Sequence, residues 1–475
     1  MRTQLFIGGD WVDAASGDVF AVYDPSSGEL IAEVSSGAAA DAAAAADAAA
    51  TAQRGWAATA PRERSEILRS CWEIMIAASD ELSELIVREH GKPLADARGE
   101  VAYAAEFFRW NAEETVRLAG QIYRAPSGAN RFLVQHPPVG VVAMITPWNF
   151  PAAMITRKVA PALGAGNAVV IKPAPDTPLT ALRVAELLTE AGVPPGVVNV
   201  VPTESAQEWL DATVDHKSVR MLSFTGSTTV GQHLLRRCAD RVLKVALELG
   251  GNAPFVVLAD ADVDAAVDGA MVAKMRHSAE TCVAANRFFV ESPVVDEFTE
   301  RLVARMSAVH VGAGFEDAVA CGPLINQRAV DKTERIIAGA VADGARVELG
   351  GHQLERPGYF YAPTVLSGVS AGSAVTREEL FAPVAPVIAF DDDDEMLSWV
   401  NDTEMGLAGY IYGSDLSRTL RLAERIESGM IGINRGFMSD PAAPFGGMKQ
   451  SGLGREGGRE GIYEFCETQF IAVDW

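Results

Sequence analysis

The sequence of 475 residues lacks the features of several special classes of protein. It has no apolar run that approaches the roughly 20 residues of a membrane-spanning helix. Its first residues contain neither a basic stretch nor an apolar core, so they do not resemble a secretory signal. These absences predict a cytoplasmic protein that does not bind membranes.

Cysteine and positive charge are also scarce. The five cysteines are an odd number, lie far apart and form neither CxxC pairs nor Cys/His clusters. We therefore expect no disulfide framework, no zinc site and no other metal site. Asp and Glu number 63 against 40 Lys and Arg, and the formal net charge of -23 makes nucleic acid an unfavourable partner. A local pocket can nevertheless bind an anion.

The length and the order of the elements predict an α/β protein of two or three domains. Residues 38–119 are rich in Ala and have apolar positions at helical spacing. They predict several long helices with breaks at Gly55, at Pro61 and at residues 91–93. From residue 139 onward, strands of buried type alternate with helices. This alternation predicts βαβ units and a parallel sheet, with a ligand site at the carboxyl ends of its strands.

The stretch RHSAETCVAANRFFV, residues 276–290, places Cys282 among small residues before a predicted strand. If the protein is an enzyme, Cys282 is the candidate nucleophile. A thiol reacts as its thiolate, which needs a lowered pKa or a nearby base in an electropositive pocket. Lys274, Arg276 and Arg287 supply positive charge nearby in the sequence. A lone cysteine is more often a core residue, so the assignment depends on the other motifs of the chain.

Three further motifs carry polar groups at the ends of predicted strands. Asn149 lies between aromatic residues in PWNFP, directly after an apolar strand. Gly226 and Ser227 precede a helix, where backbone N–H groups can bind a phosphate, although ordinary helix caps have the same composition. Glu248 lies within the apolar strand VALELGG. An unpaired buried carboxylate is costly and is often an acid or base, whereas a structural ion pair is the alternative.

Seven motifs follow one another along the chain: PWNFP, KPAPDTP, FTGSTTVG, LELGG, ETCVAANR, EELFAP and PFGGMKQSG. Together they resemble the aldehyde dehydrogenase superfamily over almost the whole sequence. Within that superfamily, LELGGNAPFVV, ITRK, TCVAANR and GLGREG are most similar to the succinate-semialdehyde dehydrogenases. The resemblance implies NAD(P)-dependent oxidation of an aldehyde to a carboxylic acid, with succinate semialdehyde as the expected substrate.

The resemblance implies three parts of the chain. Residues 1–117 and 138–250 form a Rossmann-like cofactor-binding domain, residues 251–450 form an α/β catalytic domain, and residues 118–137 and 451–475 form a small β oligomerisation extension. Residues 444–457 predict a glycine-rich surface loop, and residues 465–471 predict an edge strand that can pair with another subunit. By analogy with the family, we expect a homodimer or a homotetramer.

The resemblance also implies a catalytic set. Cys282 is the nucleophile, Glu248 the general base, and the Asn149 amide with the backbone N–H of Cys282 the oxyanion hole. Thiolate attack on an aldehyde gives a tetrahedral alkoxide, which neutral donors stabilise without protonating it, so that it can expel hydride. The resulting thioester must be hydrolysed by water, which needs a base. Glu248 therefore also argues against the coenzyme A-acylating branch of the family.

For the cofactor, the resemblance places a set of residues around the dinucleotide: Trp148, Lys172, Ala174, Pro175, Gly226, Ser227, Leu249, Glu379 and Phe381. Pro175 departs from the NAD-specific pattern, because a Glu at this position accepts hydrogen bonds from the ribose hydroxyls. Without that carboxylate a 2′-phosphate is no longer repelled, so NADP is permitted and NAD is not excluded. Asp176 beside it leaves both cofactors open.

For the substrate, Arg157 in ITRK and Arg276 in KMRH match the arginines that bind the far carboxylate in semialdehyde dehydrogenases, with Ser439 as a third contact. Guanidinium groups bind carboxylates through two parallel hydrogen bonds. The alternative is that both arginines form structural ion pairs. His277 and Glu280 also depart from the Asn and Gln that are usual in the family.

Other functions remain open from the sequence. An enzyme for aromatic or uncharged aliphatic aldehydes would use the same catalytic residues, with structural roles for the arginines. A thioesterase would use Cys282, Asn149 and Glu248 without hydride transfer. A binding protein could retain the fold without activity, which the presence of all three catalytic positions disfavours.

Overall fold

The structure is a computed structural model that describes residues 1–474, and its first large sheet has eight strands. Their order is β2-β1-β9-β8-β7-β10-β11-β21, in which β9 to β11 run parallel and the strands at both edges run antiparallel. The bounds are β1 (Leu5–Ile7), β2 (Asp10–Val12), β7 (Val141–Ile145), β8 (Ala168–Lys172), β9 (Val198–Val200), β10 (Val219–Thr225), β11 (Lys244–Glu248) and β21 (Gly452–Leu453).

Helices cover both faces of this sheet, as the alternation of strands and helices predicts. One core contains side chains of α2 (Pro61–Ala77), α3 (Ser79–His90), α4 (Leu94–Thr115), α5 (Ala153–Ala165) and α6 (Pro178–Glu190). The other core contains side chains of α1 (Ala39–Ala58), α7 (Ala206–Asp215) and α8 (Thr228–Ala239). The doubly wound arrangement confirms the predicted α/β class.

Helix α1 continues through Gly55, so the predicted break there is wrong. A single Gly in a helix costs only about 1 kcal/mol relative to Ala. The surrounding Ala residues favour the helix, and the indole of the following Trp56 is buried and donates a hydrogen bond to the carbonyl of Leu163 at 3.0 Å. The predicted breaks near Pro61 and Gly91 do separate helices, and Gly91 has a left-handed backbone with φ of 88°.

The second large sheet has the order β14-β15-β16-β13-β12-β18-β19, with β14 antiparallel to its neighbour. One face packs on α9 (Val263–Met275) and α10 (Val295–Ser307), and the other on α11 (Gln327–Ala342), α12 (Asp393–Asn401) and α13 (Leu416–Ala423). The strands are β12 (Ala253–Val257), β13 (Ala285–Glu291), β14 (Arg346–Leu349), β15 (Thr364–Ser367), β16 (Val384–Phe390), β18 (Ala408–Tyr412) and β19 (Met430–Ile433).

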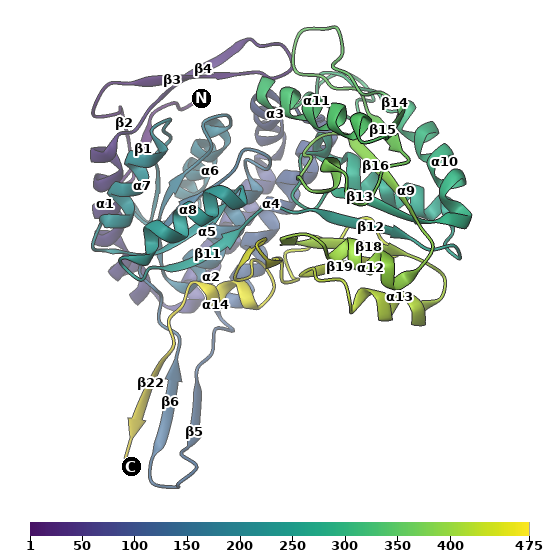
Figure 1. Cartoon of the computed structure of the whole chain (residues 1–475). Coiled ribbons are helices and arrows are strands. Elements are labelled where there is room, and N and C mark those ends of the chain that lie inside the picture. Colours follow the sequence, from purple (N-terminus) through teal and green to yellow (C-terminus); the bar gives the residue numbers. More distant parts are fainter. Residues whose placement is uncertain (475) are drawn as a thin grey trace.

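Three small sheets complete the chain. An arm of β5 (Gln121–Arg124), β6 (Arg131–Gln135) and β22 (Gln469–Val473) projects from the body (Figure 1), and β6 is its central strand. The two-stranded sheets are β3 (Val19–Tyr23) with β4 (Leu30–Ser35), and β17 (Met405–Gly406) with β20 (Met448–Lys449). Among residues 1–474, no helix is both long enough and apolar enough to cross a membrane.

Residues 444–457 do not form the surface loop that their glycines predict. They contain β20 and β21, and β21 pairs with β11 next to Glu248. Ser451 and Glu456 are buried, and helix α14 (Glu460–Glu464) follows. Gly452, with φ of 142°, permits the close approach, because a Cβ atom there would lie 2.1 Å from the carbonyl oxygen of Leu247.

Candidate active site

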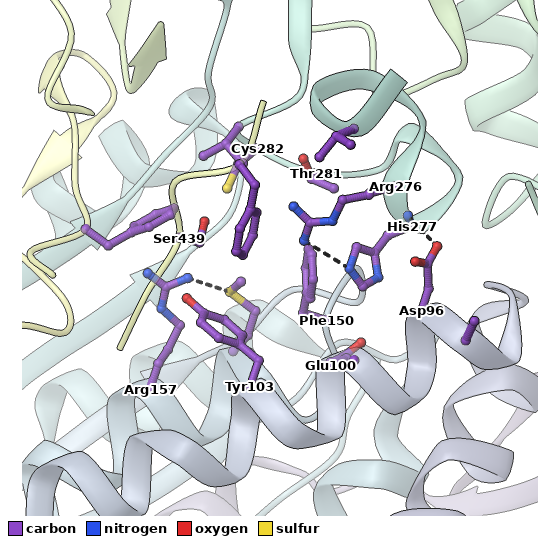
Figure 2. A pocket seen from close by; sticks show the side chains of 17 residues that line it. Asp96, Glu100, Tyr103, Phe150, Arg157, Arg276, His277, Thr281, Cys282 and Ser439 are labelled. Atoms are coloured by element: carbon purple, nitrogen blue, oxygen red, sulfur yellow. Dashed lines mark hydrogen bonds between the residues drawn. The ribbon is translucent and has the colours of Figure 1, made fainter. Parts of the chain in front are cut away.

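Two cavities meet at Cys282. The larger, of about 390 Å3, is drawn in Figure 2, where α4 and α5 supply Tyr103 and Arg157 across from the segment that carries Cys282. The smaller, of about 180 Å3, lies where the loops after β7 and β10 diverge. At this point the strand order of the first sheet reverses, so the cavity lies at the carboxyl ends of the strands, where the sequence predicts a ligand site.

Cys282 lies on the segment between α9 and β13, which has an unusual backbone. His277, Ser278 and Ala279 have φ values of 52°, 58° and 67°, although none of them is glycine. Each left-handed residue of this kind costs about 1–3 kcal/mol, and such conformations concentrate at functional sites. The N–H of His277 donates to Oδ2 of Asp96 at 2.8 Å, the hydroxyl of Ser278 accepts from the N–H of Gly322 at 2.9 Å, and all three of these side chains are buried.

The electrostatic environment of Cys282 differs from the sequence-based expectation. Burial raises the pKa of its thiol to about 12, and the charge of Arg157 opposes this rise. Arg287 is not at the site, because its guanidinium donates to the backbone carbonyls of Asn252, Trp399 and Val400. Burial lowers the pKa of Lys274 to about 7. The cation that acts on the thiol is thus Arg157, which is distant in sequence.

Asn149 follows β7 and is held at both ends. Its Nδ2 donates to the backbone carbonyl of Glu280 at 2.9 Å, and its own backbone carbonyl accepts from Nζ of Lys92 at 2.7 Å. Its Oδ1 is buried without a hydrogen-bond partner in the described part of the chain. The amide therefore has a fixed orientation beside Cys282, with which it lines the smaller cavity.

Glu248 ends β11 and is buried, with 4% of its surface exposed. Burial raises its pKa well above the usual value, and the charge of Glu456 adds to the effect, whereas Arg157, Lys158 and Arg455 oppose it. No ion pair of Glu248 forms within residues 1–474, and its Oε2 has no hydrogen-bond partner there. A structural ion pair therefore does not explain this buried carboxyl.

Glu456, which was missed from the sequence, connects Glu248 to the predicted substrate arginine. Its carboxylate lies 2.5 Å from Nε of Arg157 and 2.5 Å from Nζ of Lys158. Although burial opposes the change, these two cations lower the pKa of Glu456. Arg157 thus forms a structural ion pair, which the sequence left open as the alternative to substrate binding. It also lines the larger cavity, and its Nη2 has no hydrogen-bond partner in the described structure.

The other predicted substrate residues, Arg276 and Ser439, line the same cavity as Arg157 (Figure 2). The Arg276 guanidinium lies 4.3 Å from the ring centroid of Phe437. Burial lowers its pKa, and the charge of Asp96 opposes this. Tyr103 also lines the cavity, and burial raises the pKa of its phenol. Sequence reasoning missed Tyr103, since nothing on a helix rich in aromatic residues distinguishes it from a core side chain.

The smaller cavity brings together most of the predicted cofactor residues. Besides Cys282 and Asn149, its lining includes Trp148, Gly226, Ser227, Leu249, Glu379 and Phe381. Gly226 leaves room that no side chain could leave, because a Cβ atom there would lie 2.4 Å from the Phe224 ring. Ser227 caps α8, so the first N–H groups of that helix point toward the cavity, where they favour an anion.

Lys172, the last residue of β8, lies outside this cavity, as do Ala174 and Pro175 on the loop that follows the strand. Pro175 lines a neighbouring cavity of about 420 Å3 together with Asp176 and Asn326. Burial lowers the pKa of Lys172 to about 8, and Asp176 opposes this. The loop lies at the same carboxyl edge as Gly226, because β8 and β10 are both parallel to the intervening β7. No cluster of metal-binding side chains occurs among residues 1–474.

Cys282 and the fixed Asn149 amide line a cavity at the switch point of a parallel sheet, where doubly wound oxidoreductases bind a dinucleotide, and the charge of the buried Glu248 acts on the thiol. The chain belongs to the aldehyde dehydrogenase family, whose model matches residues 11–471. The activity of this family is the NAD(P)-dependent oxidation of aldehydes by a Cys-dependent mechanism, so the thioesterase and binding-protein alternatives are not supported.

Two relatives and one solved structure are similar to this chain over nearly its whole length. The chain is 51% identical to the succinate-semialdehyde dehydrogenase of Paenarthrobacter nicotinovorans, over 94% of this chain and 99% of that protein. It is 47% identical to the NADP(+) succinate-semialdehyde dehydrogenase of Escherichia coli, over 99% and 98% of the two chains. The solved structure of succinate-semialdehyde dehydrogenase from Burkholderia pseudomallei superposes with a TM-score of 0.98 at 47% identity, covering 100% of this chain and 98% of that one.

Proposed function

We propose that this aldehyde dehydrogenase oxidises a short semialdehyde, with succinate semialdehyde as the first candidate, to the dicarboxylic acid. One observation carries the proposal: two guanidinium groups, the buried one of Arg157 and the partly buried one of Arg276, line the cavity at the candidate nucleophile Cys282. An uncharged aldehyde would add no anionic partner to Glu456, which pairs with Arg157, and Asp96, whose charge acts on Arg276. The substrates named for the relatives at 51% and 47% identity support the same choice.

In the first half of the reaction, the Cys282 thiolate attacks the aldehyde carbon. The Asn149 amide and the backbone N–H of Cys282 stabilise the alkoxide that forms. Burial disfavours the thiolate, so Cys282 must pass its proton to solvent water in the cavity before it attacks, and Arg157 is the cation that favours the anion. Because Asn149 cannot donate a full proton, the alkoxide keeps the electron pair that expels hydride.

The smaller cavity would hold a nicotinamide, which would supply the acceptor for that hydride. Trp148 and Phe381 form an aromatic wall there, with ring centroids 5.8 Å apart, and can exclude water from the nicotinamide. Glu379 can hold its ribose, because its Oε1 is already fixed by the N–H of Gly251 at 3.0 Å. Burial raises the pKa of Glu379 to about 7. The N–H groups at the start of α8 can bind the phosphates.

In the second half, water hydrolyses the thioester on Cys282. Glu248 is the base in this proposal, and its raised pKa favours proton uptake from water at neutral pH. Its unpartnered oxygen leaves it free to contact that water. Lys158 and Arg157 stabilise the carboxylate form, so Glu248 can return the proton to solvent between turnovers.

Either nicotinamide cofactor fits the proposal. Pro175 supplies no carboxylate against a 2′-phosphate, and the Escherichia coli relative is named for NADP(+). Asp176, which lines the same cavity as Pro175, supplies a negative charge that would favour NAD. We therefore propose NADP as usable and leave the preference between the two cofactors to measurement.

The test compares kcat/KM for succinate semialdehyde and for butanal, which has the same length without the carboxylate. The wild type should prefer the semialdehyde. In Arg276→Gln, kcat/KM should fall by about 10- to 150-fold for the semialdehyde, which corresponds to a charged hydrogen bond of about 1.5–3 kcal/mol. The value for butanal should hardly change. Arg305→Gln, which removes an exposed guanidinium on α10, is the matched control.

Equal rates for the two aldehydes would refute carboxylate recognition and leave the dehydrogenase intact. A preference for an aromatic aldehyde is the second possibility, and one observation favours it: Phe150, Phe437 and Phe445 also line the cavity. The same assay, run once with NAD and once with NADP as the cofactor, measures the cofactor preference.

The division into a cofactor-binding domain, a catalytic domain and an oligomerisation extension stays a proposal, as does a cytoplasmic location. The arm of β5, β6 and β22 supports a homodimer or homotetramer. It exposes large apolar side chains, among them Ile122, Tyr123 and Phe470. Its outer strands β5 and β22 have unpaired edges. Light scattering of the purified protein tests the oligomeric state.

A further inference from the structure

A cluster of buried polar side chains packs against Asn149 and has no part in the reaction described above. We call it the polar cluster, and its members are His90, Lys92, Glu100, His277 and Glu280, all of which are at most 4% exposed. Two of them contact Asn149 directly, since Lys92 donates to its backbone carbonyl and the carbonyl of Glu280 accepts from its amide.

Lys92 and Glu100 satisfy each other. The Lys92 ammonium lies 2.6 Å from Oε2 of Glu100, and Oε1 of Glu100 accepts from the N–H groups of Ala152 and Ala153 at 2.9 and 3.3 Å. This ion pair neutralises both charges and ties Asn149 to the start of α5. The cation of the cluster is therefore already paired, and no second full positive charge remains for Glu280.

Glu280 and His90, in contrast, each have buried polar atoms without a hydrogen-bond partner in the described part of the chain. Oε1 of Glu280 accepts from the N–H of Ile325 at 3.0 Å, but its Oε2 lies 3.7 Å from Nε2 of His90. Neither atom has a hydrogen-bond partner among the described residues, although both side chains are fully buried. An ionised carboxylate in such a place costs several kcal/mol, whereas a protonated carboxyl that turns toward the imidazole, so that the 3.7 Å separation shortens to hydrogen-bond distance, would satisfy both atoms.

We propose that Glu280 is a positioning residue, which as a neutral carboxylic acid donates a hydrogen bond to Nε2 of His90 and thereby fixes the carbonyl that holds the Asn149 amide. The proposal rests on the proposed role of Asn149 in the oxyanion hole. It gives a reason for an acid at this position, two residues before Cys282. A neutral Glu280 also avoids a negative charge that would oppose the alkoxide.

The charges around the pair favour its neutral form. Burial raises the pKa of Glu280 well above the usual value, the N–H of Ile325 and the charge of Lys92 oppose this, and Asp176 adds to it. Burial also lowers the pKa of His90, and Lys92 lowers it further. His277 is held neutral in the same way. The carboxyl should therefore keep the proton, and the imidazole should accept the hydrogen bond.

The first test detects the proton directly. The infrared difference spectrum of wild type minus Glu280→Gln, recorded in the purified enzyme at pH 7.5, should contain the carbonyl band of a protonated carboxylic acid. A carboxylate band in its place would overturn the proposal. This measurement needs no turnover, so it stands apart from a failure of the proposed function, which would appear as a wild type that oxidises no aldehyde.

The second test measures positioning. Gln keeps a neutral donor and an acceptor, so Glu280→Gln should retain kcat within about 3-fold. Glu280→Met keeps the size but no donor, and kcat should fall by about 10- to 100-fold with KM nearly unchanged, as expected for a misplaced oxyanion donor. At alkaline pH, wild-type kcat should decline as Glu280 ionises, and this decline should be absent in Glu280→Gln.

Two controls separate positioning from stability. Glu89→Gln alters another fully buried Glu, which accepts from the N–H groups of Leu179 and Thr180, and it should leave the alkaline decline unchanged. His90→Leu should reproduce the loss of kcat in Glu280→Met, and it replaces that variant if the Met protein does not fold. A folded Glu280→Met enzyme with wild-type kcat, or a Gln variant as slow as Met, would overturn the proposal.

Discussion

Replacing Glu456 by Gln tests how this side chain controls both the substrate arginine and the general base. Glu456 contacts Arg157 and Lys158 at 2.5 Å each, and its charge is the second cause, after burial, of the raised pKa of Glu248. In Glu456→Gln, two buried cations lose their anionic partner, and Glu248 becomes their nearest remaining candidate. The pKa of Glu248 should therefore fall.

Glu456→Gln should also lower the stability of the fold, because it breaks a buried ion pair. Removing one partner of a buried ion pair typically costs about 3–5 kcal/mol, and the amide of Gln should keep the loss near the lower value. The folded-state pKa of Glu456 is depressed, so its stabilisation is present above the unfolded value of 4.5 and is lost as pH falls. The stability difference between wild type and variant should thus be larger at pH 7 than at pH 4.

For activity, the loss of a neighbouring carboxylate should lower the pKa of Glu248, because the charge of Glu456 helps to raise it. The assay is the pH dependence of steady-state kcat compared with the burst of nicotinamide reduction, since deprotonated Glu248 acts after the burst. We expect the acidic limb of kcat to move to lower pH in Glu456→Gln, while the burst remains. A limb that stays in place, or moves to higher pH, would refute the link between Glu456 and Glu248.

Three further predictions follow from the site. In Glu248→Gln the burst of nicotinamide reduction should persist, but steady-state kcat should fall by about 10²- to 10⁴-fold, because thioester hydrolysis loses its base; loss of the burst itself would contradict this. In Pro175→Glu, kcat/KM with NADP should fall about 10-fold or more relative to NAD, because a carboxylate repels the 2′-phosphate. In Gly226→Ala, the new methyl group would lie 2.4 Å from the Phe224 ring, so the Kd of NADP measured by calorimetry should rise while thermal stability changes little.

Several features of this protein follow from its sequence alone. Apolar strands that alternate with helices predict a parallel sheet covered on both faces, because each amphipathic element must bury one side. The seven ordered motifs predict the family, and they identify Cys282, Glu248 and Asn149, since each of these polar residues interrupts an otherwise apolar or small-residue stretch. These patterns are local, so they can be recognised without knowledge of the tertiary contacts.

Other features depend on contacts between residues far apart in the chain. The cation beside Cys282 is Arg157, which is 125 positions away by its number, whereas the nearby Arg287 turns toward backbone carbonyls elsewhere. The glycines of residues 444–457 predict a loop, but the pairing of β21 with β11 buries Glu456 beside Arg157. The sequence contains the charges, but not the distances on which their interaction depends.

The sequence by itself therefore determined the class of fold and the family, and it predicted the reactive groups. Only the tertiary structure decided the burial and the charged neighbours of those groups, the pairing of Arg157 with Glu456, and the placement of Glu280 beside His90 and Asn149. The physical reason is that secondary structure and motifs depend on neighbours in sequence. Burial and Coulomb interactions depend on separation in space, which the packing of the two sheets sets.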